Sequence, residues 1–320
     1  MYNYTAYNLG ICSALPLPEL QTSAEVAADV TIRFSRLDWS PPPHAITSDE
    51  LCFEVTSQEA HLFWGQLGKF RVARGTEIII DPLPGVEERL LRLPLLGTVF
   101  AVLLHQRGHL VLHASAVAIN GESIVFIGNK GWGKSTMAAM LYGRGHQFIA
   151  DDVVAVDFAD SGCPMVMPGF PQFKLYPEAV ATSLGDDYEM LPELADGYEK
   201  RGRPARDRFA SQPMPLKNVY ALGCGPVSLL RPLEPQASLL TLIANSYMTR
   251  FGNQLLQGAE ASTHLLQCSR VIRQVPVYRL ERPNALPLLP AVAQLVEDHL
   301  QNGSRRAFGT ENQNTSIHKV

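Results

Sequence analysis

The sequence predicts an α/β protein in which a small β-rich module precedes a nucleotide-binding domain with a phosphate-binding loop. Residues 51–81 alternate apolar and polar side chains in short runs separated by glycines, a pattern typical of antiparallel strands. Residues 124–141 read as an apolar run, a glycine-rich loop and a helical apolar segment, and two adjacent aspartates follow within another apolar run at 148–154. The second and third observations predict a nucleotide site with an acidic strand beside it.

Chain length and composition limit the classes of protein. A chain of 320 residues is long for one hydrophobic core and fits a main domain with a smaller companion. The net charge of -4 provides no overall positive field, so neither nucleic acid nor membrane is expected as a partner. The five cysteines lie far apart without C-x-x-C spacing, which indicates neither a disulfide framework nor a zinc site. With no signal-peptide pattern at residues 1–10, we expect a cytoplasmic protein.

Glycine- and proline-rich breaks in the chain predict the domain boundaries. We expect a β-rich module at residues 1–85, the nucleotide-binding domain at 86–300, and a disordered polar tail at 301–320. Residues 86–106 predict a helix that packs on the main sheet. Further helices are predicted at 238–256 and 286–300, and a strand at 275–280.

A phosphate-binding loop is predicted at residues 128–135, which read G-x-x-x-x-G-K-S. Its glycines let successive backbone N–H groups point at phosphate oxygens. Lys134 adds a positive charge against the β- and γ-phosphates, and the Ser135 hydroxyl can ligate Mg²⁺. The helix that follows presents its positive end to the same anion. We expect ATP with Mg²⁺, although the residues do not separate ATP from GTP. The candidate nucleotide-binding residues are Gly128, Asn129, Lys130, Gly131, Trp132, Gly133, Lys134, Ser135 and Thr136.

Asp151 and Asp152 are the candidate acidic residues of this site. Carboxylates within an apolar strand are costly unless they meet a metal, a substrate or hydrogen-bond donors. A triphosphate site needs acidic magnesium ligands, so a phosphate loop nearby favours a functional role over an exposed turn. Only fifteen residues separate Ser135 from Asp151, so the helix is short and the chain returns directly to an adjacent strand.

His113 is the third candidate, placed by the geometry of a hairpin. Residues 110–119 predict a strand, and Asn120-Gly121 favours a two-residue turn. A tight turn pairs Ile119 with Glu122, which sets His113 opposite Gly128 at the start of the loop. The alternative is that His113 has a structural role only, with its hydrogen bonds satisfied within the sheet.

Together these elements resemble the catalytic domain of HPr kinase/phosphorylase, the bacterial protein-serine kinase of the phosphotransferase system. The resemblance covers residues 113–152 and includes Arg144-Gly145-His146 and Ala150-Asp151-Asp152. Segments 168–171, 174–177, 215–217 and 275–280 are similar to HPr-kinase-related proteins of peptide-modification gene clusters, among them lasso peptide kinases. The resemblance implies a phosphoenolpyruvate-carboxykinase-like fold, with a largely antiparallel core and helices outside. A Glu-Ile-Arg-Gly motif and the signature C-terminal loop of the true HPr kinases are missing, so the resemblance does not extend to HPr as acceptor or to phosphorylase activity.

The resemblance also implies roles for the matching residues. Lys134 and the loop amides hold the phosphates, and His113 lies near the γ-phosphate. Asp151 is the expected base, and Asp152 the expected magnesium ligand, together with Ser135, or an orienting group. Neighbouring strand residues face opposite ways, so the order of the two aspartates stays open.

These roles predict a kinase that moves the γ-phosphoryl group of ATP to a serine of a small protein or peptide. Related kinases form oligomers, so a homo-oligomer is also expected. A basic segment at residues 200–208 could close over the transferred phosphate or over an acidic peptide, or could be a solvated loop. Two alternatives remain: a kinase of a small-metabolite hydroxyl, and a nucleotide-gated binding protein without phosphotransfer.

Overall fold

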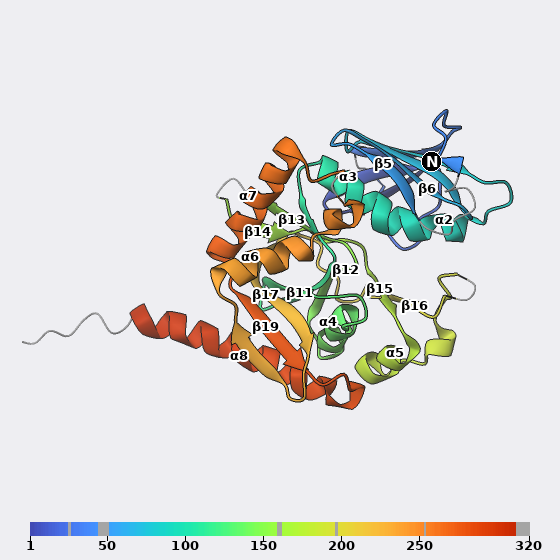
Figure 1. Ribbon diagram of the computed structural model, residues 1–320. Coiled ribbons are helices and arrows are strands. Elements are labelled where there is room, and N and C mark those ends of the chain that lie inside the picture. Colours follow the sequence, from blue (N-terminus) through green and yellow to red (C-terminus); the bar gives the residue numbers. More distant parts are fainter. Residues whose placement is uncertain (25–26, 44–50, 159–161, 196–197, 253, 312–320) are drawn as a thin grey trace, which may run out of the picture.

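The protein has a mixed α/β fold built around two large sheets (Figure 1). The computed structural model describes residues 1–320 except 25–26, 44–50, 159–161, 196–197, 253 and 312–320. No described helix has the length and apolar character needed to cross a membrane.

The N-terminal sheet has eight strands in the order β3-β1-β2-β4-β8-β7-β6-β5. The predicted strands between residues 51 and 81 form the antiparallel meander β5 to β8. Residues before 38 complete the same sheet, because β4 pairs in parallel with both β2 and β8. The strands are β1 (Tyr2–Ala6), β2 (Leu9–Ser13), β3 (Gln21–Thr22), β4 (Val30–Phe34), β5 (Cys52–Val55), β6 (Glu59–Trp64), β7 (Gly68–Ala73) and β8 (Glu77–Pro82).

The predicted helix at 86–106 is continuous but changes type in its middle. It consists of α2 (Glu88–Pro94), the π-helical turn η1 (Leu95–Val99) and α3 (Phe100–Gln106). Pro94 has no N–H to donate, and the wider turn begins directly after it. The expected packing on the main sheet is only part of the arrangement. Most buried residues of this helix belong to a core shared with the N-terminal sheet, to which Val111, Val153 and Phe170 of the main domain also contribute.

The main sheet has nine strands and holds the predicted hairpin. Its order is β12-β10-β11-β17-β14-β13-β9, and β19 pairs with β17 and β18. Most pairs are antiparallel, but β17 runs parallel to both β11 and β19. The strands are β9 (Leu110–Leu112), β10 (Ala114–Ile119), β11 (Glu122–Ile127), β12 (Gln147–Asp151), β13 (Val154–Phe158), β14 (Pro164–Val166), β17 (Met214–Cys224), β18 (Leu229–Pro232) and β19 (Val277–Arg282).

Helices cover both faces of this sheet (Figure 1). Ile124 and Phe126 of β11 join the core formed with α4 and α8, whereas Val125 and Ile127 face the core that includes residues of α6 and α7. This alternation is that of a strand buried on both sides. The remaining elements are α4 (Lys134–Gly143), β15 (Gln172–Leu175), α5 (Pro177–Leu184), η2 (Tyr188–Met190), β16 (Arg201–Pro204), α6 (Pro235–Ala244), η3 (Tyr247–Phe251), α7 (Gly258–Gln274), η4 (Leu286–Leu288) and α8 (Leu289–Glu311).

Several predicted boundaries in the C-terminal half differ from the structure. The helix expected at 238–256 is α6, which ends at Ala244 and is followed by the separate turn η3. The helix expected at 286–300 begins as η4 and continues as α8 to Glu311. Residues 312–320 of the expected tail lie outside the described residues. Helices α5 and α7 had no counterpart in the sequence prediction.

Candidate active site

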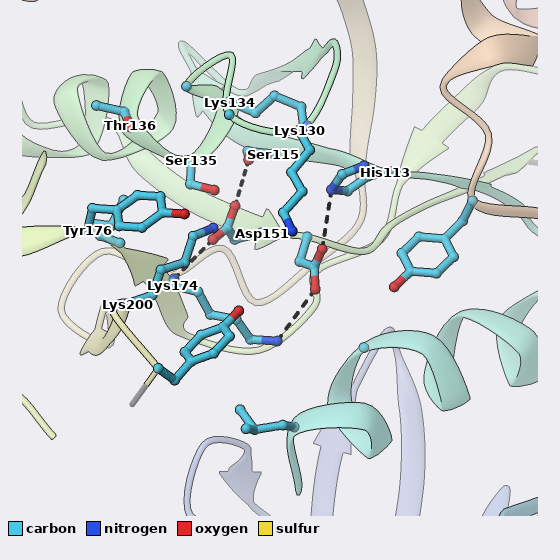
Figure 2. Close-up of a pocket in the computed structure, with 18 of the residues that line it drawn as sticks. His113, Ser115, Lys130, Lys134, Ser135, Thr136, Asp151, Lys174, Tyr176 and Lys200 are labelled. Atoms are coloured by element: carbon cyan, nitrogen blue, oxygen red, sulfur yellow. Dashed lines mark hydrogen bonds and ion pairs between the residues drawn. The ribbon is translucent and has the colours of Figure 1, made fainter. Parts of the chain in front are cut away.

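The phosphate loop connects β11 to α4 and lines a cavity of about 490 Å³ (Figure 2). Gly133 caps the N-terminus of α4 with a φ of 80°, a left-handed conformation that favours glycine. Six of the nine predicted nucleotide-binding residues line this cavity: Lys130, Gly131, Gly133, Lys134, Ser135 and Thr136.

The other three residues of the loop hold its shape from outside the cavity. The Gly128 N–H donates to Asn245 Oδ1 at 2.8 Å, and the Trp132 N–H donates to the Asn129 carbonyl at 3.2 Å. The Trp132 carbonyl accepts a bond of 3.1 Å from the Arg282 guanidinium, which is buried at the end of β19. The loop is therefore braced by two elements distant in sequence.

Lys134 lies buried at the start of α4. Its Nζ donates to the carbonyl oxygens of Gly128 at 2.8 Å and Asn129 at 3.2 Å. Burial lowers the pKa of Lys134 to about 8, although the charges of Asp151 and Asp152 act in the opposite direction. The side chain is therefore still mainly an ammonium ion at pH 7, the charge that the predicted contact with phosphate requires.

Two neighbouring strands break at the same level and direct side chains into the cavity. The predicted strand 110–119 is interrupted at His113, where the chain changes partner from β13 to β12. The partner strand is interrupted after Asp151, between the register pairs Ser115↔Asp151 and Leu112↔Val154. Asp152 sits in this break with a φ of 71°, an unusual conformation for a residue other than glycine. Strained backbone of this kind is common at functional sites.

Asp151 is buried and held by two donors. The Ser115 hydroxyl donates to Oδ1 at 2.6 Å, and the Lys174 N–H donates to Oδ2 at 3.1 Å. In Figure 2 the Asp151 carboxylate and the Ser135 hydroxyl lie on the same side of the cavity. Because one donor comes from β10 and the other from β15, Asp151 has a fixed orientation.

Asp152 lines the same cavity and lies between two nitrogen atoms. His113 Nε2 lies 3.5 Å from Oδ1, and Lys174 Nζ lies 3.5 Å from Oδ2. Burial alone would raise the pKa of Asp152, but the neighbouring positive charges, led by Lys174, lower it. The carboxylate is therefore ionised at neutral pH.

His113 is positioned by the hairpin as the sequence predicted. The register from Ile119↔Glu122 to Ala114↔Ile127 confirms the tight turn, and His113 follows at the end nearest Gly128. The Asn245 carbonyl accepts from the His113 N–H at 2.9 Å, and the Asn245 side chain accepts from the Gly128 N–H. Burial first, and then the charges of Lys134 and Arg250, lower the pKa of His113 to about 3. A neutral ring accepts at Nδ1 from Arg250 at 2.8 Å and presents Nε2–H to Asp152.

The site contains groups that suit a divalent cation. The carboxylates of Asp151 and Asp152 and the hydroxyl of Ser135 supply the hard oxygen ligands that Mg²⁺ prefers. Within the part of the chain that the structure describes, three or more His, Cys, Asp or Glu side chains nowhere gather into a metal cage.

Comparison with known proteins points to the same segment. Residues 107–163 match the family model of the HPr Serine kinase C-terminal domain. These residues include the strand break at His113, the phosphate loop and both aspartates. Among solved structures, the HPr(Ser) kinase/phosphatase from Coxiella burnetii matches 64% of this chain and 98% of its own, with 14% identity and a TM-score of 0.37. A search of curated proteins found no match.

Several residues of the cavity were not predicted as site residues. Ser115 was detectable in principle, because it lies two positions after His113 on a strand that passes the acidic pair. Lys174, Tyr247 and Arg250 line the cavity from segments whose distance from the loop in sequence gives no local signal.

The basic segment contributes less to the cavity than predicted. Lys200 lines it, but none of the four arginines of the segment does. Arg201 pairs with Glu193 and Arg203 with Asp186, while Arg208 donates to the Tyr142 carbonyl at 2.8 Å. Arg201, Arg203 and Arg208 therefore brace neighbouring elements in this structure, and closure of the segment over phosphate stays a prediction.

Proposed function

We propose that this protein transfers the γ-phosphoryl group of Mg-ATP to a serine hydroxyl of a small protein or peptide. The observation that carries the proposal is that one cavity contains both Lys134 and Ser135 of the phosphate loop and the two aspartates. Phosphoryl transfer requires positioned phosphates, a metal ligand and a group that accepts the hydroxyl proton. A protein that only senses nucleotide has no need of that last group. The match of this segment to a serine kinase domain supports the same reaction.

The contacts of the two aspartates support different roles. Asp151 is oriented by Ser115 and by a backbone N–H of β15, so it is ready to accept the proton of the attacking hydroxyl. Asp152 is kept ionised by nearby positive charge, which weakens it as a base but suits a ligand of a cation.

The remaining groups bind and orient the nucleotide. Lys134 and the loop N–H groups hold the β- and γ-phosphates, and Ser135 and Asp152 hold Mg²⁺ with them. When bound, the cation offsets negative charge on the phosphates. Neutral His113 lies 3.5 Å from Asp152 and keeps it in place, and it would lie beside the γ-phosphate of a bound nucleotide.

The test is transfer of label from γ-labelled ATP, with Mg²⁺, to a pool of serine-containing peptides from the source cell. Wild type is compared with Lys134→Ala, Asp151→Asn and Asp152→Asn. Lys217→Ala is the matched control, because Lys217 is exposed and pairs with Glu122 away from the cavity. Unlabelled GTP added as competitor shows which nucleotide is preferred.

Each outcome has a distinct meaning. The proposal is supported if wild type and Lys217→Ala label peptide serine, and if Lys134→Ala, Asp151→Asn and Asp152→Asn each reduce this labelling at least a hundredfold. In that case Asp151→Asn should still bind Mg-ATP, whereas Asp152→Asn should need more Mg²⁺. Label that reaches only free serine or sugars indicates a small-metabolite kinase. Nucleotide binding that needs Lys134, with no labelled acceptor, indicates a nucleotide-gated binding protein.

A further inference from the structure

A groove leads from the active-site cavity along the junction between the N-terminal sheet and the main domain. A second cavity of about 260 Å³ shares Leu93 and Lys174 with the first. A third cavity of about 580 Å³ shares Pro18, Arg92 and Arg206 with the second. The three cavities thus follow one another from the catalytic carboxylates to the outer part of the N-terminal module.

Both parts of the chain supply walls of this groove. Helix α2 and the loop between β2 and β3 form one side, and the ribbon β15–β16 with the segment before β16 forms the other. On β15, Gln172 and Lys174 both line the second cavity, as residues two apart on one face of a strand do. The same Lys174 binds Asp152, so the groove opens directly at the catalytic pair.

The charged groups of the groove leave a positive excess. Its two glutamates are already paired: Glu19 with Arg92 at 2.8 Å, and Glu193 with Arg201. Arg206 donates to the Pro18 carbonyl at 2.7 Å, and among the described residues it has no carboxylate partner. Its side chain is exposed, so this guanidinium can bind a carboxylate from outside.

The other lining groups suit a polypeptide. Leucines and prolines dominate the apolar surface, and the Gln172 amide can both donate to and accept from a backbone. The apolar lining residues are Pro18, Leu93, Leu96, Pro171, Pro192, Leu194 and Pro204.

We propose that this groove binds the acceptor as an extended peptide with an acidic side chain near the phosphorylated serine. This inference rests on the proposed function. A small metabolite would be enclosed by the first cavity and would leave the two outer cavities without a role. An extended segment instead follows the groove and presents alternate side chains to its walls, with its carboxylate at Arg206.

The test measures peptide binding separately from phosphate transfer. Two pools of fluorescein-labelled peptides of equal length carry one central serine, flanked by random Glu, Leu, Pro and Ala in one pool and Lys, Leu, Pro and Ala in the other. Binding to the full chain is followed by anisotropy with a non-hydrolysable ATP analogue present. We expect wild type to bind the acidic pool at least tenfold more tightly.

Variants at Arg206 show whether the groove causes the tighter binding of the acidic pool. Arg206→Glu should abolish the preference for the acidic pool, Arg206→Lys should keep most of it, and nucleotide affinity should be unchanged in both. Arg231→Glu is the matched control, because Arg231 is an exposed arginine of β18 outside these cavities.

If wild type binds the two pools equally, or if Arg206→Glu keeps the preference for the acidic pool, the groove is not the peptide-binding site. This conclusion holds whether or not peptides are phosphorylated. If binding of the acidic pool depends on Arg206 but no phosphoryl group is transferred from ATP, the groove is a peptide-binding site and the proposed kinase activity is wrong.

Discussion

The hydroxyl of Ser115 donates to Asp151 Oδ1 at 2.6 Å across the register of β10 and β12. Both side chains are buried, and the Ser115 side chain is 0% exposed. The bond exists because the strands pair Ser115 directly with Asp151. The sheet therefore sets the direction of the proposed base before any substrate binds, which is the kind of preorganisation that lowers a catalytic barrier.

Replacing Ser115 with Ala should lower kcat without changing the affinity for ATP. A hydrogen bond to a charged group is worth about 1.5–3 kcal/mol, and each 1.4 kcal/mol of lost barrier lowering is tenfold in rate. We expect a decrease in kcat of roughly ten- to a hundredfold in steady-state assays. Ser123→Ala is the control, because this buried serine of β11 donates to the carbonyl oxygens of Met214 and Pro215 and, among the described residues, to no carboxylate. Equal kcat values in the two variants would remove Ser115 from the mechanism.

Local signals were sufficient for part of the fold and of the site. The turn at Asn120-Gly121 decides the β10–β11 register, and that register sets where His113 lies. Glycines between short alternating runs similarly predicted the meander from β5 to β8. In these cases the partners are neighbours in sequence, so turn chemistry fixes the pairing.

The groups that complete the site depend on long-range topology instead. The phosphate loop is bonded by Asn245, at the end of α6, and by Arg282 of β19, and Asp151 is bonded by Lys174 of β15. The sequence around each of these three residues contains no pattern that predicts its partner. The same reason explains why only part of the packing of the helix at 86–106 was predicted, since α3 contacts β9 of the main sheet and also β7 of the N-terminal sheet. Its apolar face was read correctly, but the choice between two sheets as packing surface is tertiary.

Gly133 is predicted to tolerate no side chain. Its φ of 80° disfavours any L-residue, and an added Cβ would collide with the Arg282 guanidinium. Gly133→Ala should weaken ATP binding by more than tenfold, since the left-handed conformation alone costs about 1–2 kcal/mol. Isothermal titration with ATP would measure this.

The double variant Gly133→Ala/Arg282→Ala separates the two causes. Removing the guanidinium relieves the collision but not the backbone cost, so part of the lost affinity should return. If Arg282→Ala alone binds ATP like wild type, its bond to the Trp132 carbonyl does not brace the loop.

Tyr7 links the N-terminal module to the strained peptide at Asp152. Its hydroxyl donates to the Val153 carbonyl at 3.2 Å, and its ring is buried in the core shared by the two parts. Loss of this bond in Tyr7→Phe should let the break between β12 and β13 relax. We expect a decrease in kcat of about fivefold, corresponding to roughly 1 kcal/mol for one neutral hydrogen bond.

Tyr4→Phe is the matched control for Tyr7→Phe. The Tyr4 hydroxyl accepts from the Leu17 N–H at 2.9 Å in the same module, and Tyr4 lines the outermost cavity of the groove but not the active-site cavity, so kcat is compared at saturating acceptor. Both variants should lower Tm by about 2 °C. Only Tyr7→Phe should lower kcat; a matching decrease in Tyr4→Phe would mean that general loosening of the module, and not the Tyr7 bond, is responsible.

Arg144 and His146, which contributed to the family resemblance, bind helix α8 instead of the cavity. Glu297 accepts from Arg144 Nε at 2.9 Å and lies 2.8 Å from His146 Nε2. These contacts join the end of α4 to the C-terminal helix. Glu297→Gln should therefore lower the free energy of unfolding, by on the order of 1 kcal/mol for a partly exposed pair, and leave the KM for ATP unchanged.

The stability difference between wild type and Glu297→Gln should depend on pH. Hydrogen bonds from Arg144 first, with burial opposing, lower the pKa of Glu297 below its ordinary value of 4.5. A carboxyl with a lowered pKa in the folded state stabilises that state fully above its unfolded pKa, and the contribution is lost as pH falls through the folded value. Urea unfolding should thus show the full difference at pH 7 and a shrinking one below about pH 4.5. A difference that stays constant over this range would show that Glu297 acts by packing and not as a charge.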